Sequence, residues 1–130
     1  MSAAADSTGP VEVAAAVVEA INAQDAARLT ALLDPAVEVG TGRSVHAGLA
    51  AFVAWAAKEY DHLSRRYAID EYRVLDGSVL ALGWVQYVWS ADEEVADTSP
   101  IALELDVSGG HLLRLRVHDD VAAARAAFDT

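Results

Sequence analysis

The last third of the chain carries the pattern that most constrains the fold, a strict alternation of apolar with charged or polar residues. The pattern follows the glycine-rich turn at 108–110 and ends at two aspartates, Asp119 and Asp120. The apolar positions are Leu113, Leu115 and Val117, and the positions between and after them are Arg114, Arg116 and His118. A period of two residues is typical of a β-strand with one buried face and one solvated face. We therefore predict a hairpin whose second strand forms one wall of a core.

The turn before this strand admits two registers. A three-residue turn at 108–110 places Leu105 opposite Leu113. The same register places Glu104 opposite Arg114, whereas a two-residue turn sets Leu105 against Arg114. Apolar pairs and pairs of opposite charge are the favourable neighbours across two strands. We therefore expect the three-residue turn with a bulge.

Composition restricts the class of protein. The 130 residues fit one domain, 10–130, with residues 1–9 expected to be a short disordered lead without the pattern of a signal peptide. The absence of cysteine excludes disulfides, thiolate nucleophiles and cysteine-ligated metals, and points to a cytoplasmic protein. A formal net charge of -11 disfavours nucleic acid as a partner. No apolar run reaches the ~18 residues that a membrane span requires.

The first half of the chain has helical signals. Pro10 suits the first turn of a helix, and Asp25 suits the N-cap of a second, shorter helix. A third helix is expected from Gly48 to about His62, with an apolar inner face. That face is formed by Leu49, Phe52, Val53, Ala56 and Tyr60.

From Ser64 onward the pattern changes to alternation, which indicates strands joined as an antiparallel meander. The turn Asp76-Gly77 joins a strand ending at Leu75 to a long, central one at 79–89. Pro100 predicts an edge or a bulge in the next strand. A short helix over 121–128 closes the chain, so the expected class is α+β.

Four motifs follow one another along the chain. They are Ile21-Asn22-Ala23-Gln24-Asp25, Asp34-Pro35-Ala36-Val37-Glu38-Val39, His46-Ala47-Gly48 followed by Phe52, and the segment from Gly110 to Asp119. In order and spacing they resemble the motifs of SnoaL-like polyketide cyclases and ketosteroid isomerase-like proteins of the nuclear transport factor 2-like superfamily. The resemblance covers nearly all of the chain after Pro10. It implies a cone-shaped, bent antiparallel sheet wrapped around three N-terminal helices, with an internal pocket.

The resemblance also shows which catalytic groups of the family are replaced. The position of the ketosteroid isomerase base holds Val39, the oxyanion-hole tyrosine falls near Val17, and the protonated aspartate falls at Ala102. The three catalytic positions of limonene-epoxide-hydrolase-like members correspond to Gly83, Val85 and Val117. Neither mechanism has its proton acceptor at these positions. No cofactor fingerprint and no metal-ligand spacing of histidines is present, so we expect neither a cofactor nor a metal.

The implied pocket has apolar walls. We expect it to be lined by Val39, Phe52, Tyr60, Gly83, Val85, Trp89, Leu115 and Val117. The small side chains at Ala81, Gly83 and Val85 leave room either for a cavity or for close packing of the third helix.

Three polar residues remain as candidates for proton transfer, each with a structural alternative. His46 can move protons near pH 7 or begin the third helix. Asp119 can point into the pocket or cap the final helix. Tyr87 can present its hydroxyl to the pocket or pack as core.

Two functional hypotheses follow. In the first, the protein binds a small apolar molecule in its pocket, with isomerase or cyclase activity as its chemistry. In the second, it is a non-catalytic, dimeric interaction module with a filled core. We also expect a homodimer through the outer face of the sheet, where Leu80, Leu82 and Trp84 point.

Overall fold

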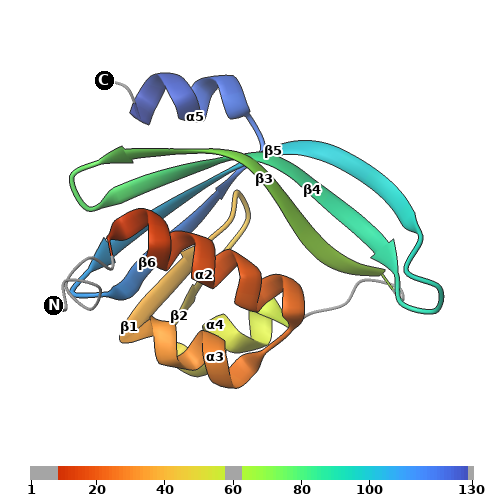
Figure 1. Cartoon of the computed structure of the whole chain (residues 1–130), viewed down its shortest axis with the longest axis horizontal. Coiled ribbons are helices and arrows are strands. Elements are labelled where there is room, and N and C mark those ends of the chain that lie inside the picture. The colour runs from red at the N-terminus through yellow and green to blue at the C-terminus, as the bar shows by residue number, and fades with distance from the viewer. Residues whose placement is uncertain (1–8, 58–62, 129–130) are drawn as a thin grey trace, which may run out of the picture.

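A computed structural model describes residues 9–57 and 63–128 of the chain. Within them lie four helices and one six-stranded sheet (Figure 1). In chain order the elements are α2 (Pro10–Ala23), α3 (Ala26–Leu32), β1 (Leu33–Gly40), β2 (Val45–Ala47), α4 (Leu49–Ala56), β3 (Leu63–Leu75), β4 (Ser78–Trp89), β5 (Val95–Ser108), β6 (His111–His118) and α5 (Val121–Phe128). The expected α+β class is confirmed.

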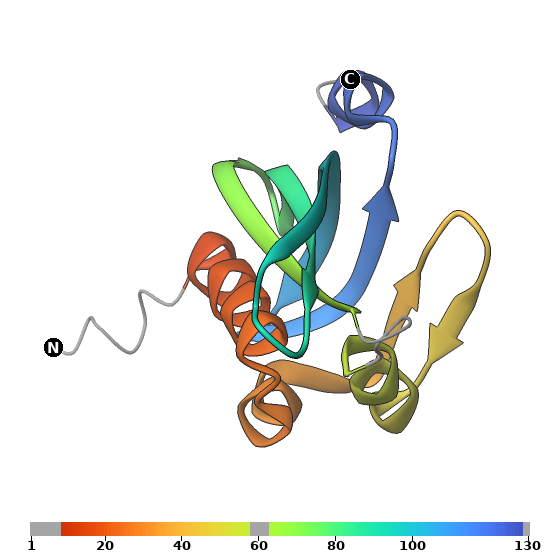
Figure 2. The same ribbon diagram turned by 90° about the vertical axis from the view of Figure 1, so that its right-hand side faces the viewer.

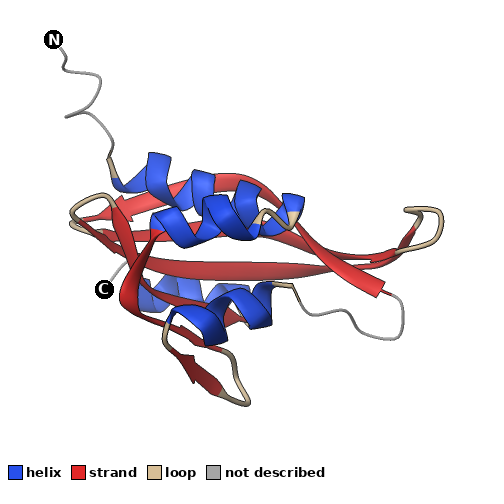
Figure 3. Ribbon diagram, turned by 90° about the horizontal axis from the view of Figure 1, so that it is seen from below, coloured by secondary structure: helices blue, strands red, loops and turns tan. Residues whose placement is uncertain are grey.

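The strands form one curved, unclosed sheet in the order β2-β1-β6-β5-β4-β3. Helices α2, α3 and α4 lie on one side of it and α5 on the other (Figures 1 and 2). The strands β3 to β6 pair antiparallel, as expected, but β1 runs parallel to β6, so the sheet is mixed. The long strands extend past the helices at the end where β4 turns into β5 (Figure 3). This arrangement is the bent cone around three helices that the resemblance implies, with a mixed sheet in place of a purely antiparallel one.

Helix ends follow the expected local rules. Pro10 begins α2, and the Asp25 side chain accepts a hydrogen bond from the Arg28 backbone N–H at 3.1 Å, which caps α3. The expectation that His46 begins the third helix is wrong, because His46 lies in β2 and α4 begins at Leu49. The predicted continuation of this helix to His62 runs into residues 58–62, which are outside the described part of the chain.

The last hairpin has a two-residue turn, so the expected three-residue turn is wrong. Gly109 and Gly110 have φ values of 58° and 80°, and Ser108 pairs with His111. Glycine adopts two such consecutive conformations at little cost. A register shift then follows one residue pair later, at Leu113, which is 39% exposed.

This bulge restores the favourable pairs two residues further along the strand. Leu105 pairs with Leu115, and both are fully buried. The acidic residues Glu104 and Asp106 lie within 3.9 and 3.8 Å of Arg116 and Arg114. The expected pairs of Leu105 with Leu113 and of Glu104 with Arg114 are therefore wrong, although apolar residues and opposite charges still face each other because of a bulge inside the strand.

Helix α5 covers the outer face of β4 and β5. A second apolar cluster there joins Leu80, Leu82 and Ala102 to Ala124, with Val121 and Phe128 packed against it. Asp120 caps α5, because its Oδ1 accepts a hydrogen bond from the Ala123 N–H at 3.0 Å. The expectation that Asp119 is the cap is therefore wrong. The Asp119 side chain does not take part in capping α5 and lines a cavity that is described below.

The outer face also bears on assembly. Because α5 covers Leu80 and Leu82 within the chain, Trp84 is the part of the expected dimer contact that stays exposed, at 42%. Its indole N–H donates to Asp70 Oδ2 at 3.2 Å. A homodimer through this face stays a prediction.

Pro100 pairs with Trp84 of β4 at a point where β6 has already ended, since the pairing of β5 with β6 begins at Ala102. The proline therefore sits on a locally free edge, as predicted.

Gly83 is a glycine because β3 passes too close to leave room for a side chain at this position. A Cβ added there would lie 2.1 Å from the Ala68 carbonyl oxygen and 2.8 Å from the Ile69 Cα, beside a bulge in β3.

Candidate functional site

A cavity of about 580 Å³ opens between the curved sheet, α4 and the loop that joins β1 to β2. Its floor is apolar and buried, and includes Tyr67, Val85 and Ile101, each 4 to 5% exposed. Its rim is polar and includes exposed side chains at Arg43 and Asp119. The full lining is Thr41, Gly42, Arg43, Trp55, Arg65, Tyr67, Val85, Tyr87, Ser99, Pro100, Ile101, Val117 and Asp119.

The pairing of the strands explains why these residues share one wall. In the β3–β4 pair, Tyr67 lies opposite Val85 and Arg65 lies opposite Tyr87. Alternate residues of a strand point to the same face, so these four side chains point together. Ser99 continues the row on β5, opposite Val85. Val117 and Asp119, also two residues apart, add the end of β6 and the residue after it.

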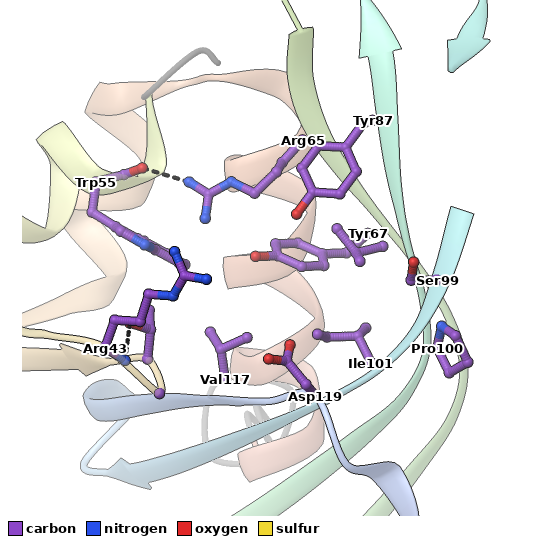
Figure 4. A pocket seen from close by; sticks show the side chains of 13 residues that line it. Arg43, Trp55, Arg65, Tyr67, Tyr87, Ser99, Pro100, Ile101, Val117 and Asp119 are labelled. Atoms are coloured by element: carbon purple, nitrogen blue, oxygen red, sulfur yellow. Dashed lines mark hydrogen bonds between the residues drawn. The ribbon is translucent and has the colours of Figure 1, made fainter. Parts of the chain in front are cut away.

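Trp55 and Arg65 form the side of the cavity nearest α4. The Arg65 guanidinium lies 4.2 Å from the centre of the Trp55 ring, within the range of a cation–π contact. One of its Nη atoms donates a hydrogen bond to the Trp55 carbonyl oxygen (Figure 4). Trp55 in turn packs edge-on against Phe52, with the ring centres 5.7 Å apart. The orientation of the Arg65 side chain is thus set before any ligand arrives.

Tyr67 is anchored from behind by the end of α2. The Asn22 side chain accepts a hydrogen bond from the Tyr67 N–H and donates one to the Tyr67 carbonyl oxygen, both at 2.8 Å. β3 is an edge strand, and at Tyr67 the Asn22 amide takes the place of a neighbouring strand. The packing of α2 therefore positions the floor of the cavity.

The charges around the cavity are unevenly placed. Figure 4 shows the Arg43 and Arg65 guanidinium groups on the Trp55 side, with the Asp119 carboxylate and the Tyr67 and Tyr87 hydroxyls also directed at the cavity. Among residues 9–57 and 63–128, neither Arg43 nor Asp119 forms an ion pair. Two arginines and one aspartate give this site a net positive formal charge in a chain of net charge -11.

Known proteins match this chain in structure and not in sequence. No protein-family model and no curated protein sequence matches the chain. Solved structures do match. An NTF2-like protein of unknown function from Burkholderia pseudomallei has a TM-score of 0.72 at 17% identity, over 90% of this chain and 95% of that one. A candidate polyketide cyclase from Sinorhizobium meliloti has a TM-score of 0.70 at 16% identity, over 82% and 94%.

A third match is a hypothetical protein with a ketosteroid isomerase-like fold from Catenulispora acidiphila, solved in complex with trimethylamine. Its TM-score is 0.71 at 13% identity, over 88% of this chain and 90% of that one. The chain has the nuclear transport factor 2-like fold. Because this fold hosts many activities, a function must be argued from the residues of the site.

The NTF2-like cone brings together four of the residues selected from the sequence. Tyr87, Asp119, Val85 and Val117 all line the cavity. Tyr60 lies outside the described residues. The other expected wall residues lie elsewhere: Val39, Phe52 and Leu115 are fully buried in the core, Trp89 is 44% exposed, and Gly83 faces the backbone of β3.

His46 lies apart from this cavity. It borders a neighbouring hollow of about 470 Å³, which shares Thr41, Arg43 and Trp55 with the first. Its Nε2 lies 3.1 Å from the Ser44 Oγ. His46 therefore contacts the β1–β2 loop and does not line the cavity that holds Asp119.

The sequence interpretation missed Arg43, Trp55 and Arg65. A signal for Arg65 exists, because it is two residues from Tyr67 and shares its face of the strand. Arg43 lies in a loop, where no periodicity indicates the direction of a side chain. Trp55 is three residues from Phe52 on α4, and this spacing places both on the same side of a helix.

Other features of the described residues lie outside the cavity. Burial, together with the nearby Glu19 carboxylate, raises the pKa of Tyr72 above its usual value. No group of three or more histidine, aspartate or glutamate side chains within residues 9–57 and 63–128 is arranged to hold a metal ion. In the same residues, every helix is too short or too polar to reach across a lipid bilayer.

Proposed function

We propose that the protein binds a small, predominantly apolar molecule in the cavity between the sheet and α4. The observation that carries the proposal is an apolar, buried floor beneath a polar rim. Small-molecule sites have this composition and volumes of about 300–1,000 Å³. The cavity also supports this hypothesis over the alternative of an interaction module with a filled core.

The ligand expected for this cavity is a flat or compact ring system. The aromatic faces of Trp55 and Tyr67 and the aliphatic side chains of Val85 and Ile101 offer dispersion contacts to such a body. The trimethylamine complex of the Catenulispora acidiphila protein supports the use of this fold for small-molecule binding.

Calorimetric titration with 2-naphthamide, a neutral two-ring probe, tests the proposal. We expect saturable binding to the unaltered protein and at least a tenfold loss of affinity in Val117→Trp, because the larger indole would take up part of the space beside the apolar floor that the ligand needs. Leu113→Trp is the matched control, since Leu113 lies on the same strand, is exposed and does not line the cavity. Equal affinities of the two variants, or no binding by the unaltered protein, would contradict the proposal.

The second candidate function is proton transfer of the isomerase or cyclase type in the same cavity. The observation that favours it is that the two aspartates after β6 have different roles. Asp120 caps α5, whereas the Asp119 carboxylate faces the cavity. Asp119 would accept a proton from a carbon next to a carbonyl group. A hydroxyl of Tyr67 or Tyr87 would donate a hydrogen bond to the resulting enolate oxygen.

Deuterium exchange at C1 of 2-tetralone, followed by proton NMR in D₂O, tests this chemistry. We expect exchange above the buffer rate with the unaltered protein and a loss of at least tenfold in that excess with Asp119→Asn. Asp120→Asn is the matched control because asparagine caps helices as well as aspartate does. Undiminished exchange in Asp119→Asn would remove Asp119 as the proton acceptor.

A further inference from the structure

We infer that the ligand of this cavity carries a carboxylate on its apolar ring system, and that Arg43 and Arg65 bind this group. The inference rests on the proposed function and adds the chemical class of the ligand, an aromatic or alicyclic monocarboxylic acid. Three features of the site support it.

The first feature is the position of the two cations. Arg43 comes from the loop between β1 and β2 and Arg65 comes from β3, yet both guanidinium groups face the cavity on the Trp55 side (Figure 4). A guanidinium presents a planar row of N–H donors that matches the two oxygens of a carboxylate. Two such groups on one side of a cavity with an apolar floor suit the acidic end of a ligand.

The second feature is that the Arg65 side chain is oriented and that the loop which carries Arg43 is closed. Trp55 fixes Arg65 through its ring and its carbonyl oxygen. The loop that carries Arg43 is closed by Thr41, whose Oγ1 accepts hydrogen bonds from the N–H groups of Arg43 and Ser44, both at 3.2 Å. Because its guanidinium is already oriented, Arg65 loses less conformational entropy when it binds a ligand, and the closed loop fixes the backbone from which Arg43 extends.

The third feature is the contrast between Arg43 and six of the seven other arginines. Ion pairs with carboxylates of the chain are formed by Arg28, Arg66, Arg73, Arg114, Arg116 and Arg125. Arg43 forms none with the described residues, although the chain has 20 acidic side chains. No carboxylate of the described residues therefore neutralises its charge beside the cavity that it lines.

The negative charges of Asp119 and of the whole chain favour a ligand with a single negative charge. The apolar floor requires that the carboxylate be attached to an apolar body. Asp119 and the net charge of -11 both oppose a second negative charge on the ligand. A monoanion is therefore favoured over a phosphate monoester, which carries close to two charges at neutral pH.

Calorimetric titration with a matched pair of probes tests the inference. The pair is 2-naphthoate and 2-naphthamide, which have the same shape and differ in charge. We expect 2-naphthoate to bind about tenfold more tightly than 2-naphthamide. In Arg43→Gln, the affinity for 2-naphthoate should fall about fivefold while that for 2-naphthamide changes less than twofold. Arg114→Gln, which removes an exposed arginine outside the cavity, should leave both affinities unchanged.

Asp119→Asn provides a second readout in the opposite direction. Removal of the carboxylate should raise the affinity for 2-naphthoate severalfold and leave that for 2-naphthamide unchanged, since the repulsion acts only on the anion. Equal affinities of the unaltered protein for the two probes would overturn the inference and leave the proposed function standing. Binding of neither probe would overturn both. An unchanged affinity of Arg43→Gln for 2-naphthoate would remove Arg43 from the site.

Discussion

Replacing Gly83 with alanine is expected to lower the free energy of unfolding by about 3 kcal/mol, a large effect for a single methyl group. The added Cβ would lie 2.1 Å from the Ala68 carbonyl oxygen and 2.8 Å from the Ile69 Cα. Both atoms belong to the backbone of β3, so no side chain can rotate away. The bulge between Ile69 and Glu71 would have to move, and with it the pairing of two long strands.

Urea denaturation followed by circular dichroism measures this effect. Gly40→Ala is the matched control, because Gly40 also lies in a strand but its added Cβ would meet only side-chain atoms at 3.9 and 4.0 Å. We expect a change within about 0.5 kcal/mol for the control. If the two variants had similar free energies of unfolding, the backbone of β3 could not lie as close to Gly83 as the structure places it.

Replacing Asn22 with alanine should cost about 2 to 3 kcal/mol of stability. The change removes two hydrogen bonds of 2.8 Å. The backbone N–H and carbonyl of Tyr67, which are partly buried, would lose their hydrogen bonds to Asn22. Asn22→Asp should also destabilise, because a carboxylate still accepts from the Tyr67 N–H but faces the Tyr67 carbonyl oxygen without a proton to donate.

The same denaturation experiment, with a control variant, distinguishes the loss of the Asn22 hydrogen bonds from the loss of any polar side chain in this region. Ser64→Ala, on the same strand as Tyr67, should change the stability by no more than about 0.5 kcal/mol. A stability of Asn22→Ala equal to that of the unaltered protein would contradict the bridging role of Asn22. Because Tyr67 forms the cavity floor, we also expect Asn22→Ala to bind 2-naphthamide less tightly.

Much of the fold could be predicted from local patterns. Pro10, Asp25 and the turn Asp76-Gly77 act on their immediate neighbours, and the elements that they begin or end lie where the sequence places them. The alternation in β6 predicted a strand but misassigned Leu113, since a bulge reverses the direction of every later side chain. The residues of the turn alone reveal neither its two-residue length nor the position of the bulge further along the strand.

The candidate site was less accessible to sequence reasoning. Val85, Tyr87 and Val117 could be placed because strand alternation near the cavity is unbroken. Gly83 shares that alternation, yet its small size accommodates the backbone of β3, which depends on the register of two strands. Arg43 faces the cavity because of the path of a loop, and no residue pattern encodes that path.

The measurement that most directly tests small-molecule binding is an NMR titration of the ¹⁵N-labelled protein with 2-naphthamide. We expect saturable shifts that are largest at the amides of Tyr67, Val85, Ile101 and Val117, which line the cavity. Absence of saturable shifts, or shifts confined to Trp84 and α5 on the outer face, would contradict it.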